Sequence, residues 1–302
     1  MSYKVDNAII MAAGTSSRFV PLSYELPKAL ITVKGEVLIE RQIRQLKEAG
    51  INEIVVVTGY KKELFYYLKE KYNIIIVEND DYDKRNNNSS IYAAKKYLKN
   101  TYICSADNYF PTNPFKSTVE FPFYSALFSK GYTDEWCIHT DNNGYIDDVT
   151  IGGSNSWYMI GHVFWNNEFS NKFVKILEDI YDMPETKDKL WETIYLEHLD
   201  TLKLKIQKYQ EGYIFEFDSL DELRKFDTSY IDNTHSKILK TIATKLNCGE
   251  SDITNISVLK SPDKISAIGF TFVVNKKKYE YVYNTKTWRQ INEQIKKCGQ
   301  KY

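Results

Sequence analysis

A loop of small residues near the start of the chain is followed by two basic side chains, a combination that suits phosphate binding. The loop reads Ala12-Ala13-Gly14-Thr15, and Arg18 and Lys28 come after it. Backbone N–H groups of such a loop can approach phosphate oxygens, and the two cations can neutralise the phosphate charge. The sequence has no G-x-x-x-x-G-K-[ST] pattern, and the next predicted strand closes on Thr58-Gly59-Tyr60 rather than on an acidic residue. We therefore expect a phosphate-binding loop that is neither a Walker loop nor a dinucleotide fingerprint.

Two aspartates follow predicted strands and are candidates for binding a divalent cation. Asp107 comes just after the apolar run Thr101–Cys104, and Asp218 ends a predicted strand and precedes a helix. A carboxylate beside a polyphosphate is best explained by a hard cation such as Mg²⁺ between them. For Asp218 a helix N-cap is the alternative, because Asp218-Ser219-Leu220-Asp221 also has the composition of a helix start.

A sheet must position these side chains, because short apolar runs alternate with amphipathic segments over roughly the first 110 residues. A helix between two buried strands is a βαβ unit, so the alternation predicts a doubly wound, Rossmann-like α/β sheet that is mainly parallel. Ligands of such sheets bind at the carboxyl ends of the strands. We expect strands at 7–11, 53–57, 74–77 and 101–104, and helices at 38–49, 62–72 and 90–98.

After Phe121 the pattern becomes mixed, with a hairpin around the turn Asp141–Gly144, so the sheet should be mixed as well. The expected strands are 123–130, 135–140, 145–151, 160–165, 203–209 and 213–217, and the expected helices are 169–181, 189–198 and 219–226.

The segment after Tyr230 has a pattern of its own and predicts a small α+β domain. We expect a helix at 236–247, strands at 253–260, 268–274 and 279–283, and a last helix from Thr287. With a boundary near Asn233, the predicted domains are 1–232 and 233–302.

Composition narrows the choice of partners. The 40 Lys and Arg residues balance 40 Asp and Glu residues, which argues against binding nucleic acid or an anionic membrane by bulk charge. No run approaches the ~20 apolar residues of a membrane span. The four cysteines are far apart and form no C-x-x-C pair, which favours a reduced, cytoplasmic protein. We therefore expect small-molecule substrates.

The order A-A-G-x-x-x-R-x-x-P-L followed by P-K-A-L resembles nucleotidyltransferases of the sugar-nucleotide pyrophosphorylase type, and among them the bacterial choline-phosphate cytidylyltransferases. One departure is Ser16, where the family often carries a second glycine, and a serine there should cost some loop freedom. The likeness covers about residues 5 to 228 and continues through Leu38–Gln42, Val57–Tyr60, Arg85–Ser90, Ser105–Tyr109, Glu135–Trp136 and Phe215–Ser219.

The resemblance implies roles for individual residues on the nucleotide side. It makes Lys28, Arg18, Asp107 and Asp218 catalytic, and the two aspartates Mg²⁺ ligands. The loop 86–90 would contact the nucleobase, although a polar turn with Ser89 or Ser90 as a helix N-cap is the alternative. The implied nucleotide contacts are Ala12, Ala13, Gly14, Thr15, Arg18, Lys28, Asn87, Ser90 and Ala106.

The resemblance also implies a choline site of aromatic faces and a carboxylate, since a quaternary ammonium cannot donate an N–H hydrogen bond. Its members would be Trp136, Trp191, Glu192 and Tyr158. Core packing is the alternative for Trp191, which shares one helical stripe with Ile194, Tyr195 and His198.

The reaction implied is CTP plus phosphocholine giving CDP-choline and pyrophosphate, by in-line attack of the acceptor phosphate on the α-phosphorus. No general base is required, because the acceptor phosphate is largely dianionic at pH 7, and none of the four histidines is assigned a catalytic role. Two alternatives stay open. One is a nucleotidyltransferase for phosphoethanolamine, 2-aminoethylphosphonate or a sugar-1-phosphate with UTP or dTTP, and the other is a non-catalytic nucleotide sensor.

Residues 236–281 weakly resemble the opening helix and hairpin of the small lobe of choline-kinase-like phosphotransferases. No H-x-D-x-x-x-x-N catalytic loop follows, so kinase activity should be absent. This predicts a vestigial or scaffolding lobe, with an oligomer contact as one role for it.

Overall fold

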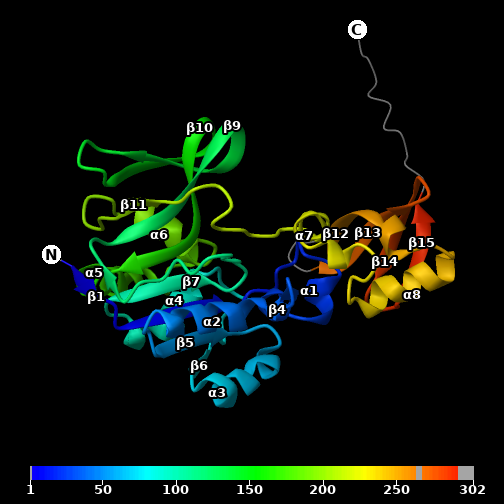
Figure 1. Ribbon diagram of the computed structural model, residues 1–302, viewed down its shortest axis with the longest axis horizontal. Helices are drawn as coiled ribbons and strands as arrows, with labels where there is room; N and C mark the ends of the chain where they lie inside the picture. The colour runs from blue at the N-terminus through cyan, green and yellow to red at the C-terminus, as the bar shows by residue number, and fades with distance from the viewer. Residues whose placement is uncertain (1, 263–266, 292–302) are drawn as a thin grey trace, which may run out of the picture. The chain divides into compact units, whose positions relative to one another are not determined.

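The computed structural model describes residues 2–262 and 267–291, and the chain forms two compact units (Figure 1). The first unit comprises residues 1–14 and 29–216, and the second comprises 15–28 and 217–302.

This division differs from the predicted boundary near Asn233, because 217–232 and the loop 15–28 pack with the C-terminal segment. The Arg224 guanidinium donates to the carbonyl oxygens of Ile253 and Glu250 at 2.8 and 2.7 Å. The ring of Tyr24 stacks on that of Tyr283 with centroids 3.7 Å apart. That the catalytic domain ends near Asn233 stays a prediction.

The first unit is built around a seven-stranded sheet in the order β11-β9-β10-β7-β2-β5-β6 (Figure 1). Strand β10 runs antiparallel to both its neighbours, and the other neighbouring strands are parallel. This confirms the predicted doubly wound, mixed and mainly parallel sheet. The strands are β2 (Asn7–Ala12), β5 (Glu53–Thr58), β6 (Ile75–Glu78), β7 (Thr101–Ser105), β9 (Phe123–Thr140), β10 (Ile146–Trp165) and β11 (Lys205–Lys208). Two short pairs join β1 (Tyr3–Lys4) to β8 (Thr118–Val119) and β3 (Thr32–Val33) to β4 (Glu36–Val37).

Strand β2 lies at the switch point of this sheet. Ile9 of β2 pairs with Val55 of β5 on one side and with Ile103 of β7 on the other. The loops that follow β2 and β7 are therefore neighbours at the carboxyl ends of the strands, which is where open α/β sheets bind their ligands. A hydrogen bond of 3.1 Å from the N–H of Ala106 to the carbonyl oxygen of Met11 joins the loop after β7 to the end of β2.

Helices on the sheet bury one apolar face each. In α2 this face includes Leu38, Ile39, Ile43 and Leu46, at the spacing of an amphipathic helix. The helices of the first unit are α2 (Leu38–Glu48), α3 (Tyr67–Tyr72), α4 (Asn88–Ala94), α5 (Asn167–Ile180) and α6 (Trp191–Leu196). The short 3-10 turns are Lys28–Leu30, which straddles the division, Lys62–Phe65, Lys95–Tyr97 and Pro184–Thr186.

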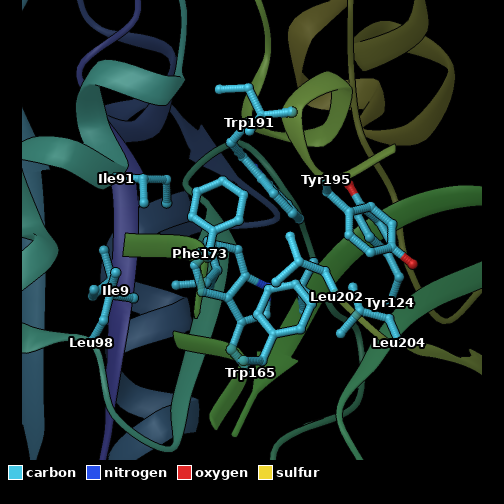
Figure 2. Packing of buried hydrophobic residues seen from close by; sticks show 14 of the residues in the cluster. Ile9, Ile91, Leu98, Tyr124, Trp165, Phe173, Trp191, Tyr195, Leu202 and Leu204 are labelled. Carbon is cyan, nitrogen blue, oxygen red and sulfur yellow. The ribbon is translucent and has the colours of Figure 1, made fainter. Parts of the chain in front are cut away.

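The core between the sheet, α5 and α6 is strongly aromatic (Figure 2). The Trp165 ring lies 4.7 Å from that of Phe173 and 5.1 Å from that of Trp191, measured between centroids. All three side chains are fully buried, so part of the chain's aromatic content is used to fill this core.

Three elements of the first unit differ from their predictions. The strands predicted at 123–130 and 135–140 are one continuous strand, β9, and those predicted at 145–151 and 160–165 are one continuous strand, β10. The two long strands pair through several register shifts. The strand predicted at 213–217 is replaced by a single bridge between Phe215 and Tyr109. The apolar residues at 214 and 217 are buried individually, and burial of this kind does not require a ladder.

The second unit contains a four-stranded antiparallel sheet in the order β12-β13-β14-β15. The helix predicted from Thr287 is wrong, because Trp288 pairs with Tyr281 and the segment extends the sheet. Residues beyond 291 lie outside the described part of the chain. The elements are α1 (Leu22–Glu25), α7 (Leu220–Phe226), α8 (Lys237–Leu246), β12 (Thr254–Lys260), β13 (Ala267–Val274), β14 (Lys277–Val282) and β15 (Thr287–Ile291), with 3-10 turns at Thr228–Tyr230 and Glu250–Asp252.

Within the described residues, no helix combines the length and the hydropathy that crossing a membrane requires. Cys104 and Cys137 are buried free thiols and Cys248 is a half-buried one, whereas Cys298 lies outside the described residues.

Candidate functional site

The loop after β2 combines two buried alanines with an open glycine. Ala12 and Ala13 are buried, and the carbonyl oxygen of Ala13 accepts the N–H of Tyr60 at 3.0 Å. A methyl group added at Gly14 would meet no atom within 4 Å. The backbone at Gly14 therefore faces space that a ligand can approach, as a phosphate-binding loop requires.

The turn after β7 carries Asp107, and side chains of α2 hold this turn by its main chain. The fully buried Gln42 donates through Nε2 to the carbonyl oxygens of Ser105 at 2.9 Å and Asn108 at 2.8 Å, one on each side of Asp107. Gln45 donates to the carbonyl oxygen of Phe110 at 2.9 Å. Helix α2 thus fixes the path of the chain on both sides of Asp107.

In the second unit, Arg18 and Asp218 form an ion pair, with Nη1 and Oδ2 2.8 Å apart. The helix N-cap proposed as the alternative for Asp218 is Ser219 instead, since Oγ of Ser219 accepts the N–H of Glu222 at 3.2 Å. The cap interpretation of Asp218 is therefore wrong, and its assignment to Mg²⁺ stays a prediction. Lys28 is buried, with its Nζ 5.6 Å from the centre of the Phe19 ring.

The loop 86–90 is tied to other parts of the first unit. Both polar ends of the Asn87 side chain are occupied, because Oδ1 accepts the N–H of Trp191 at 2.7 Å and Nδ2 donates to Glu192 at 3.0 Å. Ser90 is buried, and its Oγ accepts from Nδ2 of Asn79 at 3.2 Å. Neither Ser89 nor Ser90 caps α4, whose N-cap position is Asn87.

The residues predicted to bind choline occupy different environments. Trp191 is fully buried, and its ring packs on Trp165, Phe173 and Tyr124. This is the core packing that was the alternative to a choline contact for this residue. Its neighbour Glu192 is only half-buried.

Glu192 is the carboxylate of this region. Its Oε2 accepts from Asn87, and its Oε1 accepts from the hydroxyl of Tyr124 at 3.3 Å. Burial raises the pKa of Glu192 to about 6, and these hydrogen bonds oppose the rise. The ring of Tyr124 lies flat against that of Trp191, with centroids 5.8 Å apart and planes 17° from parallel.

Trp136 and Tyr158 come from the long hairpin. Both are half-buried, and Trp136 packs on the main core. Burial, and then the charges of Glu135, Glu211 and Glu216, raise the pKa of the Tyr158 hydroxyl.

Sequence reasoning missed two members of this region, Tyr124 and Glu216. Glu216 accepts from Nδ2 of Asn108 at 3.2 Å, and its charge also acts on Tyr124. The signal for Glu216 was its place beside Asp218 in a matching stretch, whereas Tyr124 sits in an apolar run that has no such signal. We refer to Tyr124, Tyr158, Glu192 and Glu216, which these contacts and charges connect, as the acidic-aromatic cluster.

One of the four histidines, His162, lies in the hydrophobic interior. His162 is fully buried among aromatic rings, including those of Tyr102 and Phe110, and burial lowers its pKa to about 3. In the described part of the chain, no group of three or more His, Cys, Asp or Glu side chains has the geometry of a metal site.

Several known proteins are similar to this chain in sequence and fold. The MobA-like NTP transferase domain matches residues 8–115. The choline-phosphate cytidylyltransferase of Streptococcus pneumoniae (strain ATCC BAA-255 / R6) is 34% identical over 220 residues, which are 73% of this chain and 96% of that protein. The 2-aminoethylphosphonate cytidylyltransferase of Lancefieldella rimae is 36% identical over 234 residues, which are 74% of this chain and 93% of that protein.

A solved structure of the CTP:phosphocholine cytidylyltransferase from Streptococcus pneumoniae has a TM-score of 0.71 and 34% identity to this chain, covering 75% of it and 99% of the solved chain. The relatives are thus matched over nearly their whole length, and about a quarter of this chain extends beyond the match. The shared fold and the identity over the matched length make this chain an enzyme of the nucleotidyltransferase class. It belongs to the family that includes the bacterial choline-phosphate cytidylyltransferases.

Proposed function

We propose that this chain transfers the cytidylyl group of CTP to phosphocholine, giving CDP-choline and pyrophosphate. The observation that carries the acceptor assignment is the half-buried Glu192 carboxylate, which bonds to Asn87 and to Tyr124 of the acidic-aromatic cluster. A carboxylate beside aromatic faces is the arrangement that recognises a quaternary ammonium. The Streptococcus pneumoniae relative, which is named for phosphocholine, supports the same acceptor.

The electrostatics of Glu192 suit a cation. Burial disfavours its charge and raises its pKa to about 6, so the group is still mostly ionised at pH 7. A cation beside a partly desolvated carboxylate is held more strongly than one beside an exposed carboxylate. The charge of Glu216, which acts on both Tyr124 and Tyr158, adds to the negative potential of the cluster.

The nucleotide side of the proposal rests on the two loops at the switch point of the sheet. Gly14 has open space where a side chain would be, and Ala106 is joined to β2 by its N–H. Backbone N–H groups at such a loop can bind the CTP phosphates. We further propose that Arg18 and Lys28 neutralise phosphate charge, as the resemblance implies.

A divalent cation fits the chemistry of the Asp107 turn. Mg²⁺ takes hard oxygen ligands and is usually bound by one or two carboxylates, with substrate phosphates and water completing its shell. Beside Asp107, the buried Oδ1 of Asn108 has no hydrogen-bond partner in the described structure, which leaves an oxygen for a metal-bound water. We propose Asp107 as one Mg²⁺ ligand and keep Asp218 as a second, each to be tested by itself. When bound, the ion would offset charge on the phosphates.

The proposed reaction needs no proton transfer from the protein. An oxygen of the phosphocholine phosphate forms a bond to the α-phosphorus of CTP, and the bond from that phosphorus to the bridging oxygen of the β-phosphate breaks, releasing pyrophosphate. The acceptor phosphate is already largely dianionic at neutral pH. The protein's part is to align the two substrates and to stabilise the charge that develops on the phosphates.

2-Aminoethylphosphonate is a second candidate acceptor, because a relative named for it is 36% identical to this chain. Its primary ammonium can donate hydrogen bonds, which the carboxylates of Glu192 and Glu216 could accept. We also propose a cytoplasmic location, supported by the free thiols of Cys104, Cys137 and Cys248.

Pyrophosphate release tests the proposal directly. The wild-type enzyme with Mg²⁺ is assayed with CTP, UTP and dTTP, each against phosphocholine, phosphoethanolamine, 2-aminoethylphosphonate and glucose-1-phosphate. We expect the highest kcat/KM for CTP with phosphocholine. A higher value for any other pair would replace the substrate, and no release from any pair would favour a nucleotide sensor.

Glu192→Gln tests the acceptor site. We expect the KM for phosphocholine to rise at least tenfold with little change in the KM for CTP, because the counter-charge of the cation is lost. The control is Glu197→Gln, which removes an exposed carboxylate at the opposite end of α6 that pairs with Lys189 at 2.6 Å. An equal effect from both variants would contradict the role of Glu192.

A further inference from the structure

Three consecutive asparagines, 86–88, bind the segment 186–192 that leads into and begins α6. Asn86 and Asn88 hold its main chain, since the N–H and Nδ2 of Asn86 and the Nδ2 of Asn88 all donate to its carbonyl oxygens. Those carbonyls belong to Thr186, Lys187, Asp188 and Lys189. The position of the segment is therefore fixed by the loop that was predicted to contact the nucleobase.

Asn87 differs from its two neighbours because it also bonds to a side chain of the segment. Its Oδ1 accepts the N–H of Trp191 at 2.7 Å, and its Nδ2 donates to Oε2 of Glu192 at 3.0 Å. Both ends of the amide are thus used by consecutive residues of α6. The orientation of this amide is therefore set by α6, although one N–H of Nδ2 and one lone pair of Oδ1 are not used by these two bonds.

The two contacts of Asn87 act together on the Glu192 carboxylate. One fixes the amide to the backbone of α6, and the other fixes a carboxylate oxygen to that amide. The hydroxyl of Tyr124 donates to the other oxygen at 3.3 Å. Since both donors are neutral, they orient the carboxylate without cancelling its charge.

We propose that Asn87 is a positioning and specificity residue for the acceptor, which holds the Glu192 carboxylate that meets the ammonium group. The inference rests on the proposed function, because it requires a cationic acceptor.

The pH dependence of acceptor binding gives a readout that a purely structural role would not move. The groups facing Glu192 are Asn87 of the loop 86–90 and Tyr124 of β9, and the charge of Glu216 acts on Tyr124. Burial raises the pKa of Glu192, and the bond from Asn87 lowers it. Loss of that bond therefore raises the pKa further, so Glu192 becomes protonated at a higher pH and binding of the cation weakens there.

The experiment measures the KM for phosphocholine and for CTP from pH 5.5 to 8.5 in the wild type, Asn87→Asp and Asn87→Ala. Asn87→Asp keeps an acceptor for the N–H of Trp191 and puts a like charge in place of the donor to Glu192, which also raises the pKa of Glu192. Asn87→Ala removes the bond without adding a charge. The matched control is Asn86→Ala, which removes a 3.0 Å bond to the carbonyl oxygen of Asp188 and no bond to Glu192. The phosphate of the acceptor titrates at about pH 6 in the assays of the wild type and of every variant, so only differences from the wild type are interpreted.

We expect both Asn87 variants to raise the KM for phosphocholine at least tenfold at pH 7 and to leave the KM for CTP within about twofold. The rise of the phosphocholine KM with falling pH should begin at higher pH in both, and Asn86→Ala should follow the wild type. A rise in the KM for CTP, or lost preference for CTP over UTP, with an unchanged phosphocholine KM would overturn the inference in favour of base recognition. If a variant folds poorly, calorimetric titration with phosphocholine at 10 °C replaces the kinetic assay.

The substrate assay of the wild type alone tests the proposed function. Failure of that function is therefore distinguishable from failure of the role of Asn87. If the wild type uses 2-aminoethylphosphonate or phosphoethanolamine instead, the same variants are compared with that ammonium-bearing acceptor, and the expected shifts are the same. An acceptor without a cation would overturn both the proposed function and the role of Asn87.

Discussion

The two aspartates that the family resemblance assigns to magnesium are held in different ways. Asp107 lies in a turn whose flanking carbonyls, those of Ser105 and Asn108, are bonded by the buried amide of Gln42. Asp218 is held by its carboxylate, which pairs with Arg18 at 2.8 Å while 42% of the Asp218 side chain and 72% of the Arg18 side chain stay exposed, and its N–H donates to Oε2 of Glu222 at 2.7 Å.

This difference allows the position of Asp107 and the charge of Asp218 to be tested in separate experiments. Neutral hydrogen bonds to the main chain hold the Asp107 turn in place, so Asp107 can be altered without removing them. The contact of Asp218 is ionic and exposed, and such pairs contribute little to stability, so either partner can exchange it for another ion at small cost. Variants at the Asp107 turn therefore test how the turn is positioned, and variants of the Arg18–Asp218 pair test its charge.

Asp107→Asn should have the largest effect. The substitution keeps the size of the side chain and the bonds of Gln42 to the turn, and removes the charge that a divalent cation requires. We expect kcat to fall by roughly a thousandfold, with the thermal midpoint of unfolding nearly unchanged. Pyrophosphate release and thermal unfolding measure the two quantities. A loss of less than tenfold would show that Asp107 is not a metal ligand.

Gln42→Leu should have the next largest effect. The substitution leaves the carbonyl oxygens of Ser105 and Asn108 without their donor, so the turn that carries Asp107 can shift. Changes just outside a metal's own ligands typically cost 10- to 100-fold in activity or metal affinity. We expect a loss in this range and a higher Mg²⁺ concentration for half-maximal activity.

Gln45→Leu is the matched control for Gln42→Leu. Gln45 is also a buried glutamine of α2, but it donates to the carbonyl oxygen of Phe110, beyond the immediate neighbours of Asp107. Both variants should lower the thermal midpoint, and only Gln42→Leu should change the Mg²⁺ requirement. If both change it equally, the positioning role of Gln42 is not specific.

The sequence allowed the sheet and the ends of its strands to be predicted, because buried parallel strands are apolar runs with strong local signals. Asp107 and the loop at Gly14 were placed correctly for this reason: each follows such a run. Gln42 could not be assigned from the sequence. Its partners are main-chain carbonyls more than 60 residues away, and a glutamine on an amphipathic helix gives no sign of them.

Side-chain partners explain the remaining differences. Asn87 stands in a polar loop whose residue types suit a nucleobase equally well, and only the fold shows that both ends of its amide contact α6. Trp191 and Glu192 are adjacent in the sequence, yet one fills the core and the other is half exposed. The segment Thr287–Ile291 mixes two helix formers, Arg and Gln, with Thr, Trp and Ile, which favour strands, and pairing with β14 decides for the strand.

Arg18→Gln tests the exposed pair of the second unit. We expect the KM for CTP to rise about tenfold through loss of a phosphate contact, while the free energy of unfolding changes by at most about 1 kcal/mol, since the pair is exposed. Steady-state kinetics and urea unfolding measure the two effects. Arg18→Lys keeps the charge but not the guanidinium fork, so it should restore only part of the CTP affinity. A large loss of stability would instead make the pair structural.

Ser16→Gly should have the smallest effect and concerns the backbone alone. Ser16 has a φ of 47°, in the left-handed region where a side chain costs about 1 kcal/mol or more, and its carbonyl oxygen accepts the N–H of Phe19 at 2.9 Å, a bond that glycine keeps. Glycine also adds entropy to the unfolded chain, so the net gain should lie between about 0 and 1 kcal/mol.

Ser17→Gly is its control, because Ser17 is not among the residues with positive φ and glycine there brings only the entropic cost. Opposite signs in the unfolding free energies of the two variants, measured in urea, would confirm that the family's glycine at this position relieves backbone strain. If both variants destabilise the protein, the left-handed conformation of Ser16 carries no strain.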